Sequence, residues 1–146
     1  VQRPLPIMVG GGGEKKTLRI AAKYADISHC AFNPSMEALD QKLGVLKRHC
    51  EAVYRDFDEI KVGISVNPFL GSTEQEAEVK IRKRAKQLGL TLDEYRKRLG
   101  PARGTPEQCV EAMKGYIDRG VSLFTTTFPR PADAEFFATE VIRKLR

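Results

Sequence analysis

The hydrophobic positions along the chain follow two alternating periods, and together they predict a repeated strand–helix order. An apolar run at Ile7-Met8-Val9 ends in four glycines, which is typical of a strand buried in a parallel sheet. Apolar residues then recur at helical spacing from Glu14 to Tyr24, which predicts an amphipathic helix. A second strand is expected at 26–32, and a long apolar stripe predicts a helix at 36–53, with Asn33 or Ser35 as its cap.

The second half of the chain continues this order and adds two extra helices. Strict alternation of apolar and polar residues at 60–66 predicts a third strand. Capping-box spacing at Thr73 with Glu76, and at Thr91 with Glu94, predicts two charged helices on the outside of the fold. The remaining expected elements are a helix with Thr105, Pro106 and Gln108 at its start and Gly120 at its end, a strand at 121–128, and a helix marked by Phe137, Val141 and Leu145.

Four strand–helix units imply an α/β fold with a parallel sheet and right-handed crossovers. Four units are half of a TIM (β/α)₈ barrel, which typically needs about 250 residues. The chain has 146 residues. We therefore expect a single domain, 1–146, that forms a half-barrel and carries a basic helical insertion at about 71–103.

Composition limits the classes of protein to which the chain can belong. It is 41% hydrophobic and 30% charged, which is an ordinary globular balance. The sequence contains no apolar run long enough to span a membrane and no visible secretory signal. Its three cysteines, Cys30, Cys50 and Cys109, lack the spacing of metal ligands. We expect free thiols, a cytoplasmic location and no metal site.

The net charge of +6 is concentrated in one segment. Residues 74–103 contain nine basic and five acidic residues, so nine minus five, or +4, of the charge lies there. A basic helix most often presents its charges to solvent, and Tyr95 is the only aromatic residue in this segment. Nucleic-acid binding is therefore not expected.

The glycine run at 10–13 is the first candidate site. Glycines allow a ligand to approach the backbone closely, and the following helix directs unpaired N–H groups at whatever is bound. A phosphate suits this environment, with Thr17 adding a hydroxyl and Lys15 and Lys16 adding charge. The run matches neither the dinucleotide fingerprint nor a P-loop. The alternative is a flexible turn with no ligand.

His29 is the second candidate, because catalytic side chains of such barrels project from the carboxyl ends of strands. Its imidazole can transfer a proton or contact a ligand, although a structural role is the alternative. His49 lies on the polar side of the long helix, and we interpret it as a surface residue. No glycine-flanked serine nucleophile and no carboxylate pair at a strand end is present.

Three segments resemble a known family. Residues 4–26, which read PLPIMVGGGGEKKTLRIAAKYAD, closely resemble the fifth strand and helix of luciferase-like monooxygenases. The likeness is strongest to the branch that depends on the 8-hydroxy-5-deazaflavin coenzyme. Residues 46–50 and 55–56 are similar to the next helix of that branch, and 104–121 to the helix that leads to its eighth strand. The resemblance covers nearly the whole chain except about 71–103.

The resemblance implies the C-terminal half of a (β/α)₈ barrel, with a cofactor lying across the carboxyl ends of the strands. Gly11, Gly12 and Gly13 would hold its phosphate through their amides, with help from Thr17, beside Gly10 at the strand end. The cofactor would be a deazaflavin coenzyme of the F-420 type or FMN, and the chemistry would be hydride transfer or oxygen activation.

Two departures from the family pattern stand out. Many members have tryptophan and asparagine where this chain has Ser28 and His29. The first four strands of the barrel are absent, so the resemblance assigns no catalytic residue here.

The leading hypothesis is therefore the cofactor-binding half of an oxidoreductase. Unpartnered strands would expose sheet edges, so we expect association with a second copy or with a missing N-terminal half. One alternative is a non-catalytic half-barrel module that assembles through the basic helices at 74–99. Another is a truncated fragment of a full-length enzyme, since the first residue is Val1 rather than Met.

Overall fold

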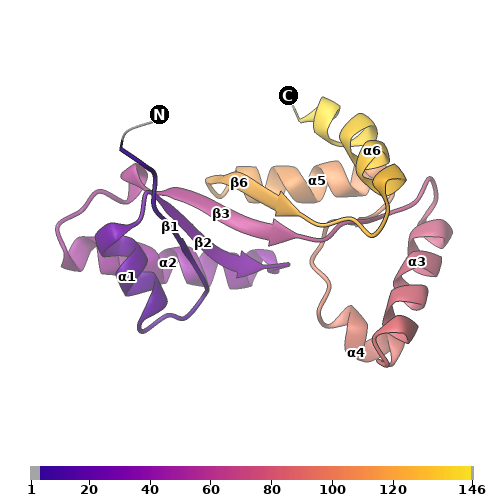
Figure 1. Ribbon diagram of the computed structural model, residues 1–146, viewed down its shortest axis with the longest axis horizontal. Helices are drawn as coiled ribbons and strands as arrows, with labels where there is room; N and C mark the ends of the chain where they lie inside the picture. The colour runs from indigo at the N-terminus through magenta and orange to yellow at the C-terminus, as the bar shows by residue number, and fades with distance from the viewer. Residues whose placement is uncertain (1–3, 146) are drawn as a thin grey trace. The chain divides into compact units, whose positions relative to one another are not determined.

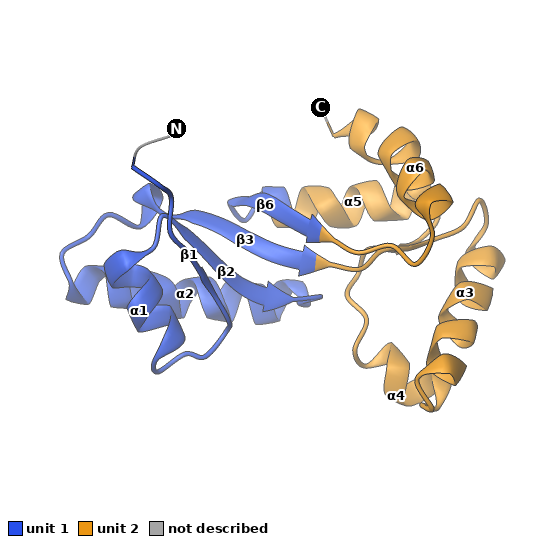
Figure 2. Cartoon of the chain, viewed as in Figure 1, with its two compact units in different colours: residues 1–65, 117–125 blue, residues 66–116, 126–146 orange. Residues whose placement is uncertain are grey.

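The computed structural model describes residues 4–145, which form two compact units (Figure 2). Within the described residues, unit 1 comprises 4–65 and 117–125, and unit 2 comprises 66–116 and 126–145. The ends of the expected single domain, at 1–3 and 146, lie outside the described residues.

A four-stranded sheet with the order β1-β2-β3-β6 is the centre of unit 1. Strand β2 pairs in parallel with both β1 and β3, as the alternation of strands and helices predicts. Two helices lie on one face of these strands (Figure 1). The elements are β1 (Met8–Gly10), α1 (Thr17–Tyr24), β2 (Ile27–Phe32), α2 (Met36–Ala52), the 3₁₀ turn η1 (Phe57–Glu59), β3 (Lys61–Val66) and β6 (Val121–Thr126).

The apolar stripes of the two helices form the core between helix and sheet. Leu18, Ala21, Ala22 and Ala25 of the first stripe are fully buried, as are Leu39 and Leu46 of the second. Small alanines on α1 leave room for its close packing against α2. The spacing of apolar residues in the sequence therefore predicted correctly which helix faces are buried.

Helix α1 begins three residues later than expected, at Thr17 rather than Glu14. Residues 14–16 form a turn, and Lys16 at the N-cap position provides no side-chain cap. Helix α2 does have a cap, because the hydroxyl of Ser35 accepts a hydrogen bond from the amide of Ala38 at 3.2 Å. The N-terminus of the helix after the glycines is therefore not capped by a side chain.

Unit 2 is mainly helical and contains a two-stranded parallel sheet, β4-β5. The sequence pattern did not predict these strands, because two residues are too few to show a period. The elements are β4 (Phe69–Leu70), α3 (Glu74–Gln87), α4 (Leu92–Arg96), β5 (Arg103–Gly104), α5 (Pro106–Ile117), α6 (Pro131–Glu140) and the 3₁₀ turn η2 (Ile142–Lys144). Buried Ile81, Ala85 and Tyr95 hold the extra helices together.

Helix caps in unit 2 largely follow the sequence predictions. Thr91 and Glu94 form a complete capping box, and Thr105 with Gln108 exchange the same pair of contacts. The first expected box is incomplete, because the carboxylate of Glu76 accepts from the amide of Ser72 instead of that of Thr73. The last helix ends at Glu140 rather than continuing to Leu145, and a 3₁₀ turn follows the buried Val141.

Candidate functional site

The glycine turn leads from the carboxyl end of β1 into helix α1. Gly10 is the last residue of the strand, and Gly11 has a φ of 124°, a conformation that residues with a side chain rarely adopt. The amide of Gly11 donates to the carbonyl of His29 at 2.9 Å. This bond fixes the start of the turn to the neighbouring strand β2.

Two of the glycines are required for steric reasons. A Cβ atom on Gly12 would lie 2.6 Å from the carbonyl oxygen of Cys30, and one on Gly13 would lie 2.8 Å from Oγ1 of Thr17. A Cβ atom on Gly10 would meet nothing within 4 Å. The backbone at Gly12 and Gly13 is thus packed closely against β2 and the first turn of α1, and the side chain of Thr17 lies beside Gly11 and Gly13.

The N–H groups of the turn are available to a ligand. Within residues 4–145, the amides of Gly12 and Gly13 donate to no protein acceptor, whereas the amide of Gly11 is already bonded. The carbonyl of Gly13 accepts from Leu18 at 3.0 Å, so the turn continues directly into the uncapped start of α1. Unbonded amides at the positive end of a helix dipole are suited to an anion such as a phosphate.

Helix α2 supplies a charge beside this turn that the sequence pattern did not indicate. The ammonium of Lys42 donates to the carboxylate of Glu14 at 2.8 Å, and Gln41 donates to the same oxygen at 2.9 Å. The hydrogen bond from Lys42 is the main cause that lowers the pKa of Glu14. The Cε atom of Lys42 lies 3.5 Å from where a Cβ of Gly12 would be, whereas the expected Lys15 and Lys16 are exposed.

The interpretation of His49 as a surface residue was wrong. Its side chain is half-buried, and its Nε2 lies 2.8 Å from the carbonyl oxygen of Glu14. Because a carbonyl only accepts, Nε2 must carry the proton in this contact. Lys42 and His49 are seven residues apart and so share one face of α2. That spacing was visible in the sequence, but nothing in the sequence indicated that the face meets the glycine turn.

His29 belongs to a cluster of three polar side chains on the sheet. Its Nε2 lies 3.0 Å from Oγ1 of Thr125 on β6, and Oγ of Ser65 on β3 lies 2.8 Å from that same hydroxyl. The distance from Ser65 Oγ to Nε2 is 3.4 Å. Sequence reasoning found the histidine but neither hydroxyl, because the three residues come from strands far apart in the chain.

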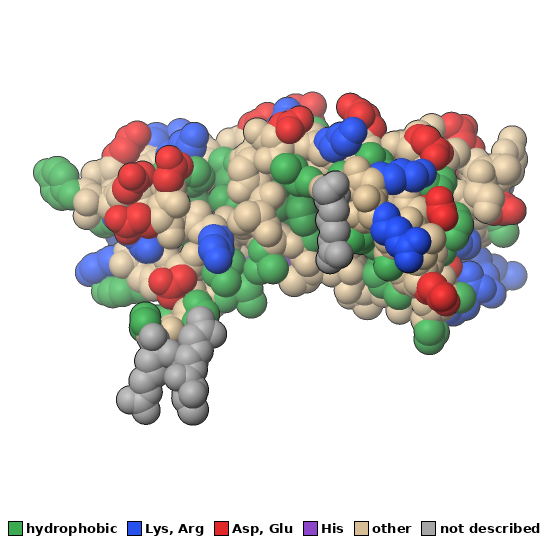
Figure 3. All heavy atoms as spheres, turned by 90° about the horizontal axis from the view of Figure 1, so that it is seen from above, with side chains coloured by type: hydrophobic (Ala, Val, Ile, Leu, Met, Phe, Trp, Pro, Cys, Tyr) green, Lys and Arg blue, Asp and Glu red, His purple; other side chains and the backbone are tan. Residues whose placement is uncertain are grey.

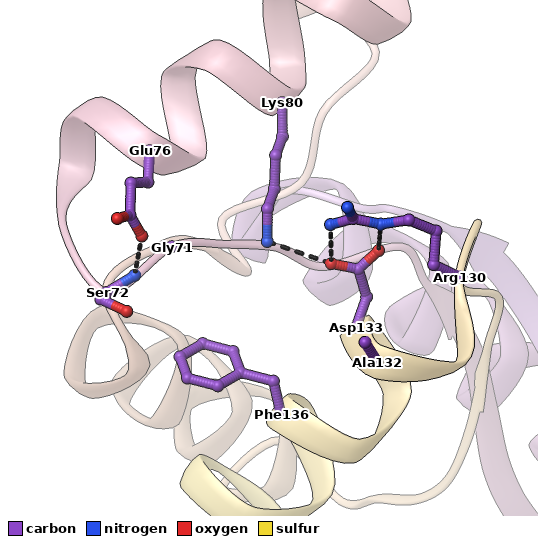
Figure 4. A pocket seen from close by; sticks show the side chains of 8 residues that line it. All are labelled: Gly71, Ser72, Glu76, Lys80, Arg130, Ala132, Asp133 and Phe136. Atoms are coloured by element: carbon purple, nitrogen blue, oxygen red, sulfur yellow. Dashed lines mark hydrogen bonds and ion pairs between the residues drawn. The ribbon is translucent and has the colours of Figure 1, made fainter.

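Unit 2 contains a separate hollow of about 200 Å³ (Figure 4). Its polar side chains are already paired: Asp133 accepts from both Lys80 and Arg130, and Glu76 accepts from the amide of Ser72. The hydrogen bonds from Arg130 and then Lys80 lower the pKa of Asp133 to about 2. The hollow shares no residue with the glycine turn, and its internal ion pairs indicate a structural role.

The cysteines do not form a reactive centre. Cys30, Cys50 and Cys109 are buried and unpaired, and burial raises the pKa of Cys109 to about 12. A thiol with so high a pKa is a poor nucleophile at neutral pH. In residues 4–145, no three His, Cys, Asp or Glu side chains gather as a metal site. None of the helices described for this chain is both long and apolar enough to cross a bilayer.

Comparison with protein families identifies the chain. The family model described as luciferase-like monooxygenase matches residues 1–103. The chain belongs to this family. The match includes 71–103, which the resemblance of the sequence did not cover, and stops before the similar segment at 104–121. A comparison with proteins of curated function finds no match.

Solved structures support the family's fold for this chain. One is the coenzyme F-420-dependent tetrahydromethanopterin reductase from Methanopyrus kandleri, with a TM-score of 0.71, 14% identity, and coverage of 97% of this chain and 51% of that structure. A second is an F-420-dependent secondary alcohol dehydrogenase in complex with an F-420–acetone adduct, with a TM-score of 0.75, 14% identity, and coverage of 99% and 50%.

A long-chain alkane monooxygenase has a TM-score of 0.75 at 16% identity, with coverage of 99% of this chain and 41% of that structure. At these identities the likeness shows the fold alone: an α/β fold with a parallel sheet, similar to luciferase-like structures. This luciferase-like chain spans about half the length of the solved structures that it matches.

Proposed function

We propose that the chain is the cofactor-binding, C-terminal half of a luciferase-like (β/α)₈ oxidoreductase. Its cofactor is a deazaflavin coenzyme of the F-420 type or FMN. The solved neighbours include enzymes described as F-420-dependent and one described in complex with FMN, which supports this choice. The strand order β1-β2-β3-β6 and the coverage of about half of each neighbour support the half-barrel.

The glycine turn carries the proposal. The amides of Gly12 and Gly13 hold the cofactor phosphate, and the hydroxyl of Thr17 lies beside them. Gly10 and Gly11 allow the phosphate to come close to the backbone of the turn. Lys42 adds a positive charge from α2. In this turn, Cβ atoms on Gly12 and Gly13 would clash with neighbouring protein atoms, and the amides of both residues are unbonded within the described part of the chain. Such a turn suits the binding of a phosphate.

The ring of the bound cofactor would supply hydride transfer, or oxygen activation in the case of FMN. The residues of this chain bind and orient it: the turn fixes the anionic tail at the carboxyl edge of the sheet. Substrate contacts depend on residues beyond this half of the fold, and we propose no catalytic residue. The free cysteines support the cytoplasmic location that the sequence predicts.

Titration of the chain with FMN and with riboflavin, which lacks the phosphate, tests the proposal. We expect FMN to bind more tightly than riboflavin. Gly12→Ala should weaken FMN binding by about tenfold or more, because the added Cβ must displace the turn from Cys30. Gly44→Ala on helix α2, outside the turn, is the matched control, since its Cβ would meet only the flexible end of Arg48 at 3.6 Å, and should leave the affinity unchanged. Equal affinities for FMN in the two variants would refute the phosphate site.

A further inference from the structure

Three strands bring the side chains of His29, Ser65 and Thr125 together on one face of the unit 1 sheet. On β2, the neighbours of His29 in sequence, Ser28 and Cys30, are buried. Because side chains alternate along a strand, His29 points to the opposite face. Gly63 makes room for the imidazole, since a Cβ there would lie 3.1 Å from its Cδ2 atom. The three residues, called the polar trio below, are half-buried or exposed.

The polar trio lies toward the carboxyl ends of the strands, as does the glycine turn. His29 pairs with Gly10 in the register of β1 and β2, and its carbonyl holds the amide of Gly11. Ser65 lies on β3, two strands from β1. Neighbouring strands are about 4.8 Å apart, so the trio extends from about 5 to about 15 Å across the sheet from β1. A cofactor with its phosphate at Gly12 and Gly13 can extend its ribityl chain and ring over that span.

The hydrogen bonds of the trio can run in either direction. When Nε2 of His29 carries a proton, it donates to Thr125, Thr125 donates to Ser65, and the hydroxyl proton of Ser65 remains free to bind a ligand. When Nε2 lacks the proton, both hydroxyls reverse and Ser65 offers a lone pair instead. A site that both donates and accepts suits a ligand oxygen that exists as a hydroxyl and as an oxyanion.

We propose that the polar trio binds the ionisable ring hydroxyl of an 8-hydroxy-5-deazaflavin coenzyme and makes the chain selective for it over FMN. This inference rests on the proposed function of the glycine turn. FMN carries a methyl group where the deazaflavin carries this hydroxyl. A methyl group would give Ser65 no ligand partner in addition to Thr125 as the ring covers it. Sites built to bind a hydroxyl discriminate against analogues that lack it.

Affinities of the full chain for the deazaflavin coenzyme and for FMN test the inference. We expect the deazaflavin to bind about tenfold more tightly. Ser65→Ala and Thr125→Val should reduce this preference to about threefold or less, and Thr125→Ser, which keeps the hydroxyl, should retain it. Ser122→Ala is the matched control, since Ser122 lies three residues earlier on β6, on the opposite face, and should change neither affinity.

The visible absorption of the deazaflavin gives a second readout, because its hydroxyl and oxyanion forms differ in spectrum. The bound wild-type chain should show an ionisation state that Thr125→Val alters and Thr125→Ser restores. Thermal unfolding of each variant confirms that it is folded. Equal affinity of the wild-type chain for both rings would overturn the proposal for the polar trio and leave the glycine-turn proposal intact. The same holds if Ser65→Ala and Thr125→Val both leave the preference and the spectrum unchanged. Absence of binding by either ring would overturn both.

Discussion

Ser28 lies buried in β2, with 1% of its surface exposed, and its side chain points to the helix-covered side of the sheet. Its hydroxyl has no hydrogen-bond partner among the described residues. Burial of an unbonded hydroxyl costs free energy, because on folding the group gives up its hydrogen bonds to water and forms none with the protein.

We therefore expect Ser28→Ala to raise the free energy of unfolding by about 1 kcal/mol, as measured by urea denaturation. Ser122→Ala removes a hydroxyl from an exposed strand position and should change the free energy by less than about 0.5 kcal/mol. A loss of stability in the Ser28 variant would indicate that the hydroxyl is bonded in solution.

Individual residues also show where sequence reasoning reached its limit. The glycine turn was visible, because four successive glycines directly after an apolar strand form a pattern within a single short segment. The neighbours of the turn, Lys42 and His49, were not, because periodicity tells which face of a helix is polar but not what that face meets. Ser65 and Thr125 were missed for the same reason, since only the order of the strands places them beside His29.

Helices α3 and α6 are joined by the ion pairs of Asp133. Its carboxylate contacts Lys80 of α3 at 3.1 Å and Arg130 at 2.8 Å, and these partners hold its pKa at about 2. An unfolded chain has an Asp pKa near 3.9, so the unfolded state binds the proton more tightly. The resulting stability is fully present above about pH 4 and is lost as the pH falls toward 2.

Asp133→Asn should therefore lower the free energy of unfolding at pH 7 by about 1 kcal/mol, a value reduced for solvent screening at the open side of the hollow. The difference between wild type and variant should shrink as the pH is lowered from 5 toward 2, in urea titrations at each pH. Glu135→Gln, at an exposed position of the same helix, should show a smaller effect. A difference independent of pH would exclude the ion pairs as its cause.

At the scale of elements, periodicity identified the long helices and the strands of the sheet, because each has a buried face that repeats. Strands β4 and β5 were missed, because two residues are too few to show a period. The early end of α6 was missed for the opposite reason, since Val141 and Leu145 keep the helical spacing beyond Glu140, where the helix ends. The late start of α1 reflects the glycines, which favour a turn over helix in the absence of a capping side chain.

The described surface of unit 1 exposes apolar side chains next to a sheet edge. Strand β1 is at the end of the strand order, and Ile7 and Met8 are 55% and 54% exposed. Phe32 of β2 is exposed as well. Hydrophobic side chains also reach the surface on the face drawn in Figure 3. An exposed strand edge with apolar neighbours favours pairing with another chain or segment.

We expect the isolated chain to self-associate through this edge, with a sedimentation coefficient that rises with protein concentration. Met8→Lys should shift the population toward the monomer, because a lysine on an edge strand opposes pairing with a second strand. Leu88→Lys places the same charge on an exposed apolar residue at the end of α3 and should leave association unchanged. Association that persists in the Met8 variant and is lost in the Leu88 variant would place the interface on unit 2. The half-barrel proposal predicts that Met8→Lys favours the monomer. The edge that would pair with a second copy is the one that the remaining strands of a barrel would occupy.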